Sequence, residues 1–194
     1  MIAPSAVVLL LAIALVRVET LRLNAFDVIK DCKQFNTAFG YNGTLNYIPI
    51  SSFTNAVDQR EFKYYVFGVL GPTGAVIRLS HSVYPYGTEV VEVVLGAYNN
   101  TKTIARHQHR KSTGEFENTD IVKMATPNLL SPFRPVMLML KVWTNGRREV
   151  LHTGQQFPFI SFMDARNITV NYMAFTKMDS NLIIFYDCPP VQSG

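Results

Sequence analysis

The 194-residue sequence lacks a long amphipathic helix and a Gly-rich turn that leads from a strand into a helix. The missing turn matters because doubly wound enzymes bind nucleotide cofactors with it. The one candidate, Gly68–Gly74 (GVLGPTG), is followed by a strand-like run, so we interpret it as a turn. No Gly-x-Ser-x-Gly motif marks a nucleophile. The sequence therefore predicts no catalytic residue and no cofactor.

Clustered charge is also scarce. The net charge is +4 and the sequence pI is about 9.1, with charges scattered except in Arg106–Lys111 (RHQHRK). This is too little basic charge for a nucleic-acid-binding protein, and we interpret the run as a solvated loop. His107 and His109 share one face of a predicted strand, but a zinc site needs three or four ligands. We predict no metal site and interpret both as exposed histidines at a strand end.

No apolar run is long enough to span a membrane. Ala6–Val16 is unbroken, whereas a spanning helix needs about 20 residues. Its length is typical of the hydrophobic region of a secretory signal peptide. A buried N-terminal strand and an uncleaved anchor are the alternatives. We predict a signal peptide over residues 1–20, one domain over residues 21–194, and an extracellular location.

Only two cysteines are present, Cys32 and Cys188. In a secreted protein an even count favours a disulfide, which here closes almost the whole domain into a ring. Two unrelated buried thiols are the alternative. Three Asn-X-Thr sequons, at Asn42, Asn99 and Asn167, are candidate glycosylation sites.

Hydrophobic alternation with a period of two predicts strands almost throughout. We expect roughly ten short strands and a short helix at most over Ala25–Lys33, which favours an all-β fold, an antiparallel β-sandwich or jelly roll with little helix. The clearest strands are Glu61–Val69, Ala75–Ser80, Glu89–Tyr98, Thr101–His109, Val136–Trp143, Asn167–Phe175 and Asn181–Tyr186.

Turn residues predict how these strands pair. Asn145-Gly146 separates two strand-like runs, which is a strong hairpin signal. Gly71–Gly74 (GPTG) predicts a similar hairpin, and Asn99-Asn100 predicts a third. In Asn167–Phe175, the alternation places Ile168, Val170, Tyr172 and Ala174 on one face and turns Asn167 outward.

A few aromatic and acidic residues are candidates for binding. Trp143 ends a strand beside a turn, and Tyr84 and Tyr86 lie in a loop, where aromatic rings stack on ligands. Packing of Trp143 between the two sheets is the alternative. Asp164 ends another strand, where it orients a ligand or caps a turn.

Several motifs together resemble one known family. They are EVVLGAYNNTKTIAR (residues 92–106), RLS (78–80), VWTNG (142–146) and PFISFMD (158–164). By their sequences and by their order along the chain, these motifs resemble the farnesoic acid O-methyltransferase domain of invertebrates, over about Phe62–Tyr186. Tyr98 and Phe162 stand where that family usually has Trp. The retained polar run after Gly96 suggests hydrogen bonding that fixes a strand crossing or a bulge, which favours Asn42 and Asn167 over Asn99 as glycan acceptors.

The resemblance implies either of two functions. The family name implies S-adenosylmethionine-dependent methyl transfer to farnesoic acid, whereas the domain also resembles all-β recognition modules. We favour a secreted module that binds a glycan or another extracellular partner, since the sequence shows no cofactor loop. A structural secreted protein without a small ligand is a further alternative. The candidate ligand-binding residues are Tyr98, Asn100, Lys102, Arg106, Trp143 and Asp164.

Overall fold

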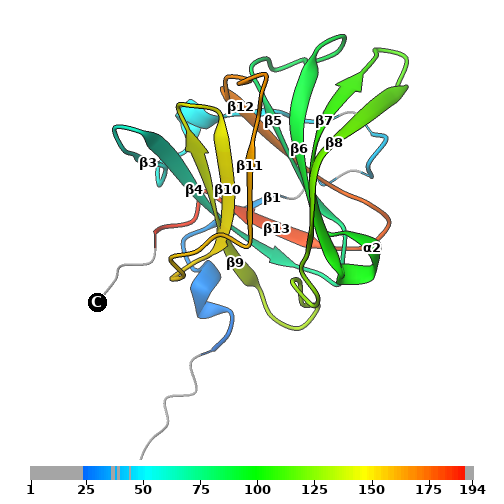
Figure 1. Cartoon of the computed structure of the whole chain (residues 1–194). Coiled ribbons are helices and arrows are strands. Elements are labelled where there is room, and N and C mark those ends of the chain that lie inside the picture. The colour runs from blue at the N-terminus through cyan, green and yellow to red at the C-terminus, as the bar shows by residue number, and fades with distance from the viewer. Residues whose placement is uncertain (1–23, 36–37, 39, 44, 191–194) are drawn as a thin grey trace, which may run out of the picture.

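The computed structural model describes residues 24–35, 38, 40–43 and 45–190, which form two antiparallel sheets packed face to face (Figure 1). The predicted all-β sandwich is confirmed. The predicted signal peptide, residues 1–20, lies outside the described residues. No helix among the described residues is long and apolar enough to cross a membrane.

The first sheet, sheet A, has the strand order β1-β13-β4-β9-β10-β11, with β3 paired to one end of β4. The predicted hairpin at Asn145-Gly146 is confirmed as β9–β10. The strands are β1 (Lys33–Phe35), β3 (Val57–Asp58), β4 (Phe62–Leu70), β9 (Val136–Trp143), β10 (Arg147–His152), β11 (Ile160–Met163) and β13 (Ile183–Tyr186).

The second sheet, sheet B, has the order β2-β12-β5-β6-β7-β8. Its centre is the predicted hairpin β6–β7, joined through the one-turn element α2 (Ala97–Asn100). The strands are β2 (Ile48–Pro49), β5 (Ala75–Ser80), β6 (Glu89–Gly96), β7 (Lys102–Arg110), β8 (Phe116–Ala125) and β12 (Tyr172–Lys177).

The main core lies between the sheets. Alternation along β6 places Val91, Val93 and Leu95 in this core, and Phe67 and Leu140 face them from sheet A. Because successive side chains of a strand point to opposite faces, Glu92 and Val94 project from the outer face of sheet B. That outer face is itself largely buried near its centre.

The predicted hairpin around Gly71–Gly74 is wrong. β4 lies in sheet A and β5 in sheet B, so this turn carries the chain from one sheet to the other. A Cβ atom on Gly71 would lie 2.4 Å from the Cβ of Leu182, so the crossing packs too closely for any larger residue. The turn residues were recognised, but turn chemistry alone does not say which sheet the next strand joins.

Two other predicted elements are shorter than expected. The strand predicted over 167–175 begins only at Tyr172, and its core face carries Met173 and Phe175 rather than Tyr172 and Ala174. The expected helix over 25–33 is a single 3₁₀ turn, Asp27–Ile29; a second 3₁₀ turn spans Ile50–Ser52. Because both faces of β12 are nearly covered, the alternation of apolar residues does not identify which face points into the core.

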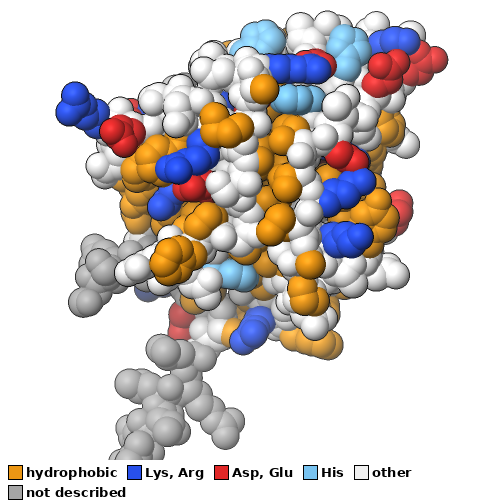
Figure 2. All heavy atoms as spheres, viewed as in Figure 1, with side chains coloured by type: hydrophobic (Ala, Val, Ile, Leu, Met, Phe, Trp, Pro, Cys, Tyr) orange, Lys and Arg blue, Asp and Glu red, His pale blue; other side chains and the backbone are white. Residues whose placement is uncertain are grey.

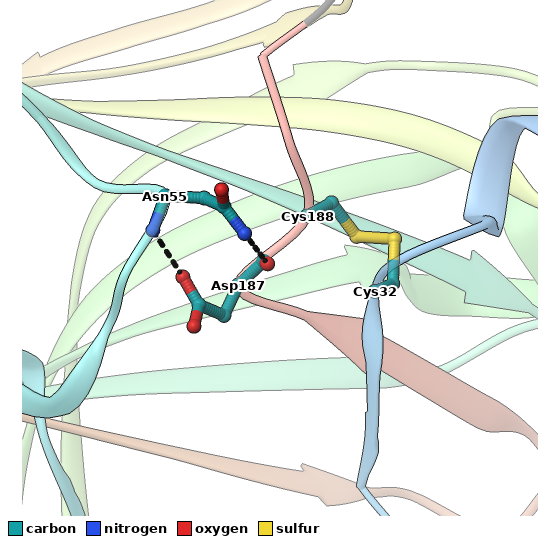
Figure 3. The surroundings of a disulfide bond; sticks show 4 residues. All are labelled: Cys32, Asn55, Asp187 and Cys188. Atoms are coloured by element: carbon teal, nitrogen blue, oxygen red, sulfur yellow. Dashed lines mark hydrogen bonds between the residues drawn. A yellow bond between two sulfur atoms is a disulfide. The ribbon is translucent and has the colours of Figure 1, made fainter.

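Cys32 and Cys188 form the predicted disulfide, across 156 residues of sequence (Figure 3). The neighbouring carboxylate of Asp187 accepts hydrogen bonds from the backbone N–H groups of Thr54, at 3.0 Å, and Asn55, at 2.8 Å. Lys33 forms an ion pair with the same carboxylate at 2.8 Å. The disulfide and these contacts fasten the N-terminal segment and the β2–β3 connection to the end of β13.

Candidate ligand-binding face

The most unusual backbone in the described structure lies in α2, between β6 and β7. Three consecutive residues, Tyr98, Asn99 and Asn100, have positive φ angles of 50°, 55° and 63°. This left-handed conformation costs an L-residue about 1–2 kcal/mol, and Asn tolerates it better than Tyr does. Gly96, with φ of 65°, leads into the turn. Such strain persists only where the surroundings hold it, and it is frequent at functional sites.

Hydrogen bonds to a neighbouring loop hold this turn. The amide side chain of Asn100 donates to the backbone oxygen of Leu130 and accepts from its N–H group, at 2.8 and 2.9 Å. The hydroxyl of Thr101 donates to the backbone oxygen of Tyr98 at 2.7 Å. The expected hydrogen bonding is therefore present. The bulge lies elsewhere, opposite Ala105 and Arg106.

The turn places Tyr98 beside a groove on the outer face of sheet B. The phenol is 62% exposed, and the ammonium of Lys102 lies 5.3 Å from its ring centroid. The groove has a volume of about 390 Å³, within the range typical of ligand pockets. Its lining is Thr73, Gly74, Val94, Ala97, Tyr98, Asn99, Ile104, Arg106, Met178, Asp179 and Ser180.

The groove combines an aromatic ring, an apolar floor and charged groups. Val94 and Ile104 are 2% and 4% exposed and form the floor, whereas Arg106 and Asp179 supply opposite charges at its walls. Two of the six predicted ligand-binding residues, Tyr98 and Arg106, thus line one groove, with Lys102 packed against Tyr98. Asn100 shapes the turn instead.

Beside the groove lies a buried ionic network that the sequence analysis missed. Glu92 accepts hydrogen bonds from Arg78, at 2.6 Å, from Arg106, at 2.7 Å, and from the hydroxyl of Tyr41, at 2.8 Å. Arg78 is 1% and Glu92 0% exposed. Burial, followed by the charge of Glu92, raises the pKa of Tyr41, so this hydroxyl stays protonated. The network fixes Arg106 at the edge of the groove.

The interpretation of Arg106–Lys111 as a solvated loop is wrong. All of the run except the exposed Lys111 belongs to β7, and His107, Gln108 and Arg110 in it are buried. Arg106, Gln108 and Arg110 alternate along the strand and therefore share the outer face, a spacing that is visible in the sequence. What covers that face, Tyr41, is more than 60 residues away in sequence, so its contact with these residues required the fold.

Asp164 lies at the end of β11, where it caps a turn. Its carboxylate accepts from the N–H groups of Arg166, at 3.1 Å, and Ile168, at 2.8 Å, and it lies 2.8 Å from the Nε2 atom of His107. The capping alternative is the one observed, and the contact with His107 ties β11 to sheet B. The structure shows no group of three or more metal-ligating side chains among the described residues.

Trp143 does not pack between the sheets. It lies on the outer face of sheet A, between the ring of Phe62, with centroids 4.6 Å apart, and the guanidinium of Arg147, 3.8 Å from its ring centroid. Its indole N–H donates to Glu149 at 2.9 Å. Figure 2 shows hydrophobic and basic side chains intermixed over β4, β9 and β10. The fold therefore separates Trp143 from the Tyr98 groove, which lies on the other sheet.

The asparagines of the three sequons are all exposed, Asn42 before β2, Asn99 in α2 and Asn167 after β11. Asn99 and Asn167 have positive φ. Occupancy at each remains a prediction.

These features define the class of the protein: an antiparallel β-sandwich with a tyrosine-bearing groove on one outer sheet face. The family profile described as farnesoic acid O-methyl transferase matches residues 41–190, so the chain belongs to this family. The resemblance predicted from the motifs is confirmed, and the match extends further toward the N-terminus than expected. Comparison with curated proteins finds no significant match.

Several solved structures show distant similarity. The carbohydrate-binding module CBM66 of Bacillus subtilis has 11% identity and a TM-score of 0.36, with 74% of this chain and 89% of that one covered. The binding domain of botulinum neurotoxin DC has 8% identity and a TM-score of 0.35, with 65% and 30% covered. An alginate lyase from Alteromonas sp. 272 has 14% identity and a TM-score of 0.21, with 72% and 65% covered. These TM-scores are too low for any property of those proteins to be transferred.

Proposed function

We propose that the protein is a secreted binding module that holds a glycan in the groove beside Tyr98. The observation that carries this proposal is the exposed phenol itself. A tyrosine that is 62% exposed in a left-handed turn buries little apolar surface for the chain, whereas a ligand gains an aromatic surface for stacking. The disulfide supports an extracellular setting, because such bonds persist in oxidising compartments.

The groove suits a sugar better than a wholly apolar ligand. A pyranose ring has an apolar face, which stacks on an aromatic ring, and hydroxyl groups that hydrogen-bond to charged side chains. Tyr98 supplies the ring, and Arg106, Lys102 and Asp179 supply charged partners around it.

A glycan array probed with the purified protein at micromolar concentration tests the proposal, with calorimetry on each positive glycan. We expect Tyr98→Ala to weaken binding at least about tenfold, as for a central aromatic contact. Phe157→Ala is the matched control, because Phe157 is 81% exposed in the loop between β10 and β11, on the other sheet. An array without positive glycans, or equal affinity of Tyr98→Ala and wild type, contradicts the proposal.

Methyl transfer is the alternative that the family description suggests. The described residues do not form the doubly wound site that commonly holds S-adenosylmethionine, since the glycine-containing turn at 68–74 connects two antiparallel sheets and enters no helix. We derive no methyl-transfer step. Calorimetry with S-adenosylmethionine at millimolar concentration discriminates the two functions, and a saturable heat would favour the alternative.

A further inference from the structure

A second, smaller hollow lies on the same outer face of sheet B. Its volume is about 10 Å³, room for about one water-sized group. Two arginines, Arg78 and Arg110, line it together with Gln108 and the aromatic rings of Tyr47 and Tyr86. The remaining lining residues are Gly43, Leu45, Pro85 and Val90.

The charged side chains around Tyr41, two of which line the hollow, carry more positive than negative charge. Three guanidinium groups, those of Arg78, Arg106 and Arg110, lie 4.8 to 5.6 Å from the ring centroid of Tyr41. Glu92 is the carboxylate paired with two of them, and both its oxygens are used by Arg78 and Arg106. Counting three arginines against one glutamate, the group has a net charge of +2.

Arg110 is the unusual member of this group. It is 8% exposed, yet none of the carboxylates among the described residues forms an ion pair with it. Its hydrogen-bond acceptors are neutral: it donates to the backbone oxygen of Tyr41 at 3.1 Å and to the amide oxygen of Gln108 at 3.4 Å.

A buried guanidinium without a carboxylate is unfavourable, since desolvation is not offset by an opposite charge. Burial, together with the neighbouring charge of Arg78, lowers the pKa of Arg110. Burial also raises the pKa of Tyr47 to about 12, which keeps its hydroxyl a neutral donor at physiological pH. The hollow is thus surrounded by hydrogen-bond donors and positive charge, the arrangement that guanidinium forks use for oxyanions.

We propose that this hollow receives one oxygen atom of an oxyanion, the carboxylate or sulfate of an acidic sugar, whose remaining part lies across the outer face of sheet B. The proposal rests on the proposed function, because it names the class of glycan. Arg110 and Arg78 bind the oxyanion, and Tyr86, 39% exposed at the rim, contacts the ring that bears it. The small volume admits one oxygen atom of the oxyanion and leaves the rest of the charged group and the sugar outside.

Binding titrations followed by two-dimensional amide NMR test this site with sodium sulfate, sodium glucuronate, glucose 6-sulfate and glucose, at constant ionic strength set with sodium chloride. We expect saturable shifts in and around β7 with sulfate and with at least one acidic sugar, and none with glucose. Arg110→Gln abolishes these shifts. Arg60→Gln, the same change at an exposed arginine in the β3–β4 turn, leaves them intact. If Arg110→Gln does not fold, Arg110→Lys replaces it as the test. This variant keeps the charge but loses the planar guanidinium, so we expect weakened binding.

The outcomes separate this inference from the proposed function. Sulfate binding that is equal in wild type and Arg110→Gln, or lost equally in Arg60→Gln, overturns the oxyanion site. Binding of glucuronate without glucose 6-sulfate assigns the carboxylate, and the reverse assigns the sulfate. An array positive only for neutral glycans, unaffected by Arg110→Gln, leaves the binding module standing and overturns the acidic ligand. Sulfate binding at Arg110 together with an array that shows no positive glycan keeps the oxyanion site and overturns the glycan-binding function.

Discussion

Asn100 and Leu130 are joined by two reciprocal hydrogen bonds, at 2.8 and 2.9 Å, between the side-chain amide of one and the backbone of the other. The pair connects the left-handed turn that carries Tyr98 with the loop between β8 and β9. The shape of the proposed ligand groove therefore depends on a residue that touches no part of it.

Asn100→Ala removes both hydrogen bonds and places a residue with poor left-handed tolerance at φ 63°. We expect the free energy of unfolding to fall by about 2 kcal/mol, since each lost bond and the unpaired backbone groups contribute. Urea unfolding measures the change. Asn99→Gly, in the same turn, is the control and should be nearly neutral because glycine adopts positive φ freely. Equal stability of Asn100→Ala and wild type would show that the hydrogen bonds to Leu130 do not stabilise the turn.

Replacing Cys32 and Cys188 with alanine removes the disulfide, which links residues 156 apart in sequence. The unfolded chain then has more conformational entropy, which favours unfolding. The chain-entropy model gives a loss of up to about 5 kcal/mol. We expect a lower urea midpoint for the double variant than for the oxidised wild type. The wild type under reducing conditions should fall to the same lowered midpoint. Unchanged midpoints after reduction would mean that the Asp187 contacts alone hold the two ends together.

Asp187 makes stability depend on acidic pH. Burial opposes ionisation, but hydrogen bonds from Lys33, Thr54 and Asn55 outweigh it and lower the pKa of this carboxyl. Because the folded-state pKa lies below the unfolded value of about 4, the contribution is present above about pH 4 and is lost as the pH falls through the folded-state value.

Asp187→Asn tests this dependence while keeping a side chain that tolerates the φ of 51° at this position. The difference in unfolding free energy between wild type and variant should stay constant from about pH 7 to about pH 5 and shrink below about pH 4. Urea midpoints across this range measure it. A difference that does not change with pH would assign the contribution of Asp187 to packing rather than charge.

Glu92→Gln leaves the buried Arg78 without its carboxylate. Breaking a buried ion pair by removing one partner costs roughly 3–5 kcal/mol, so we expect this variant to be among the least stable. Glu117→Gln, in the exposed edge strand β8, makes the same chemical change and should alter stability by less than about 0.5 kcal/mol. Similar losses in the two variants, measured by thermal unfolding, would contradict the buried network.

The sequence alone determined the class of fold, because alternation and turn residues are local properties. The β6–β7 and β9–β10 hairpins are correct for that reason: each pairs neighbouring strands through Asn-containing turns. The cysteine pair was predictable from the even count together with the predicted secretion. The family motif around Tyr98 was also readable, although the left-handed turn within it was not.

Tertiary structure decided everything that depends on which sheet a strand joins. The turn at 68–74 crosses between sheets, and Trp143 faces outward, because long-range pairing of β4 and β9 sets their faces. Arg106 and Arg110 are part of a buried cluster because Tyr41 packs against them and Glu92 pairs with Arg106. A sequence records which charges exist, whereas burial and net charge at a point depend on distant segments brought together by packing.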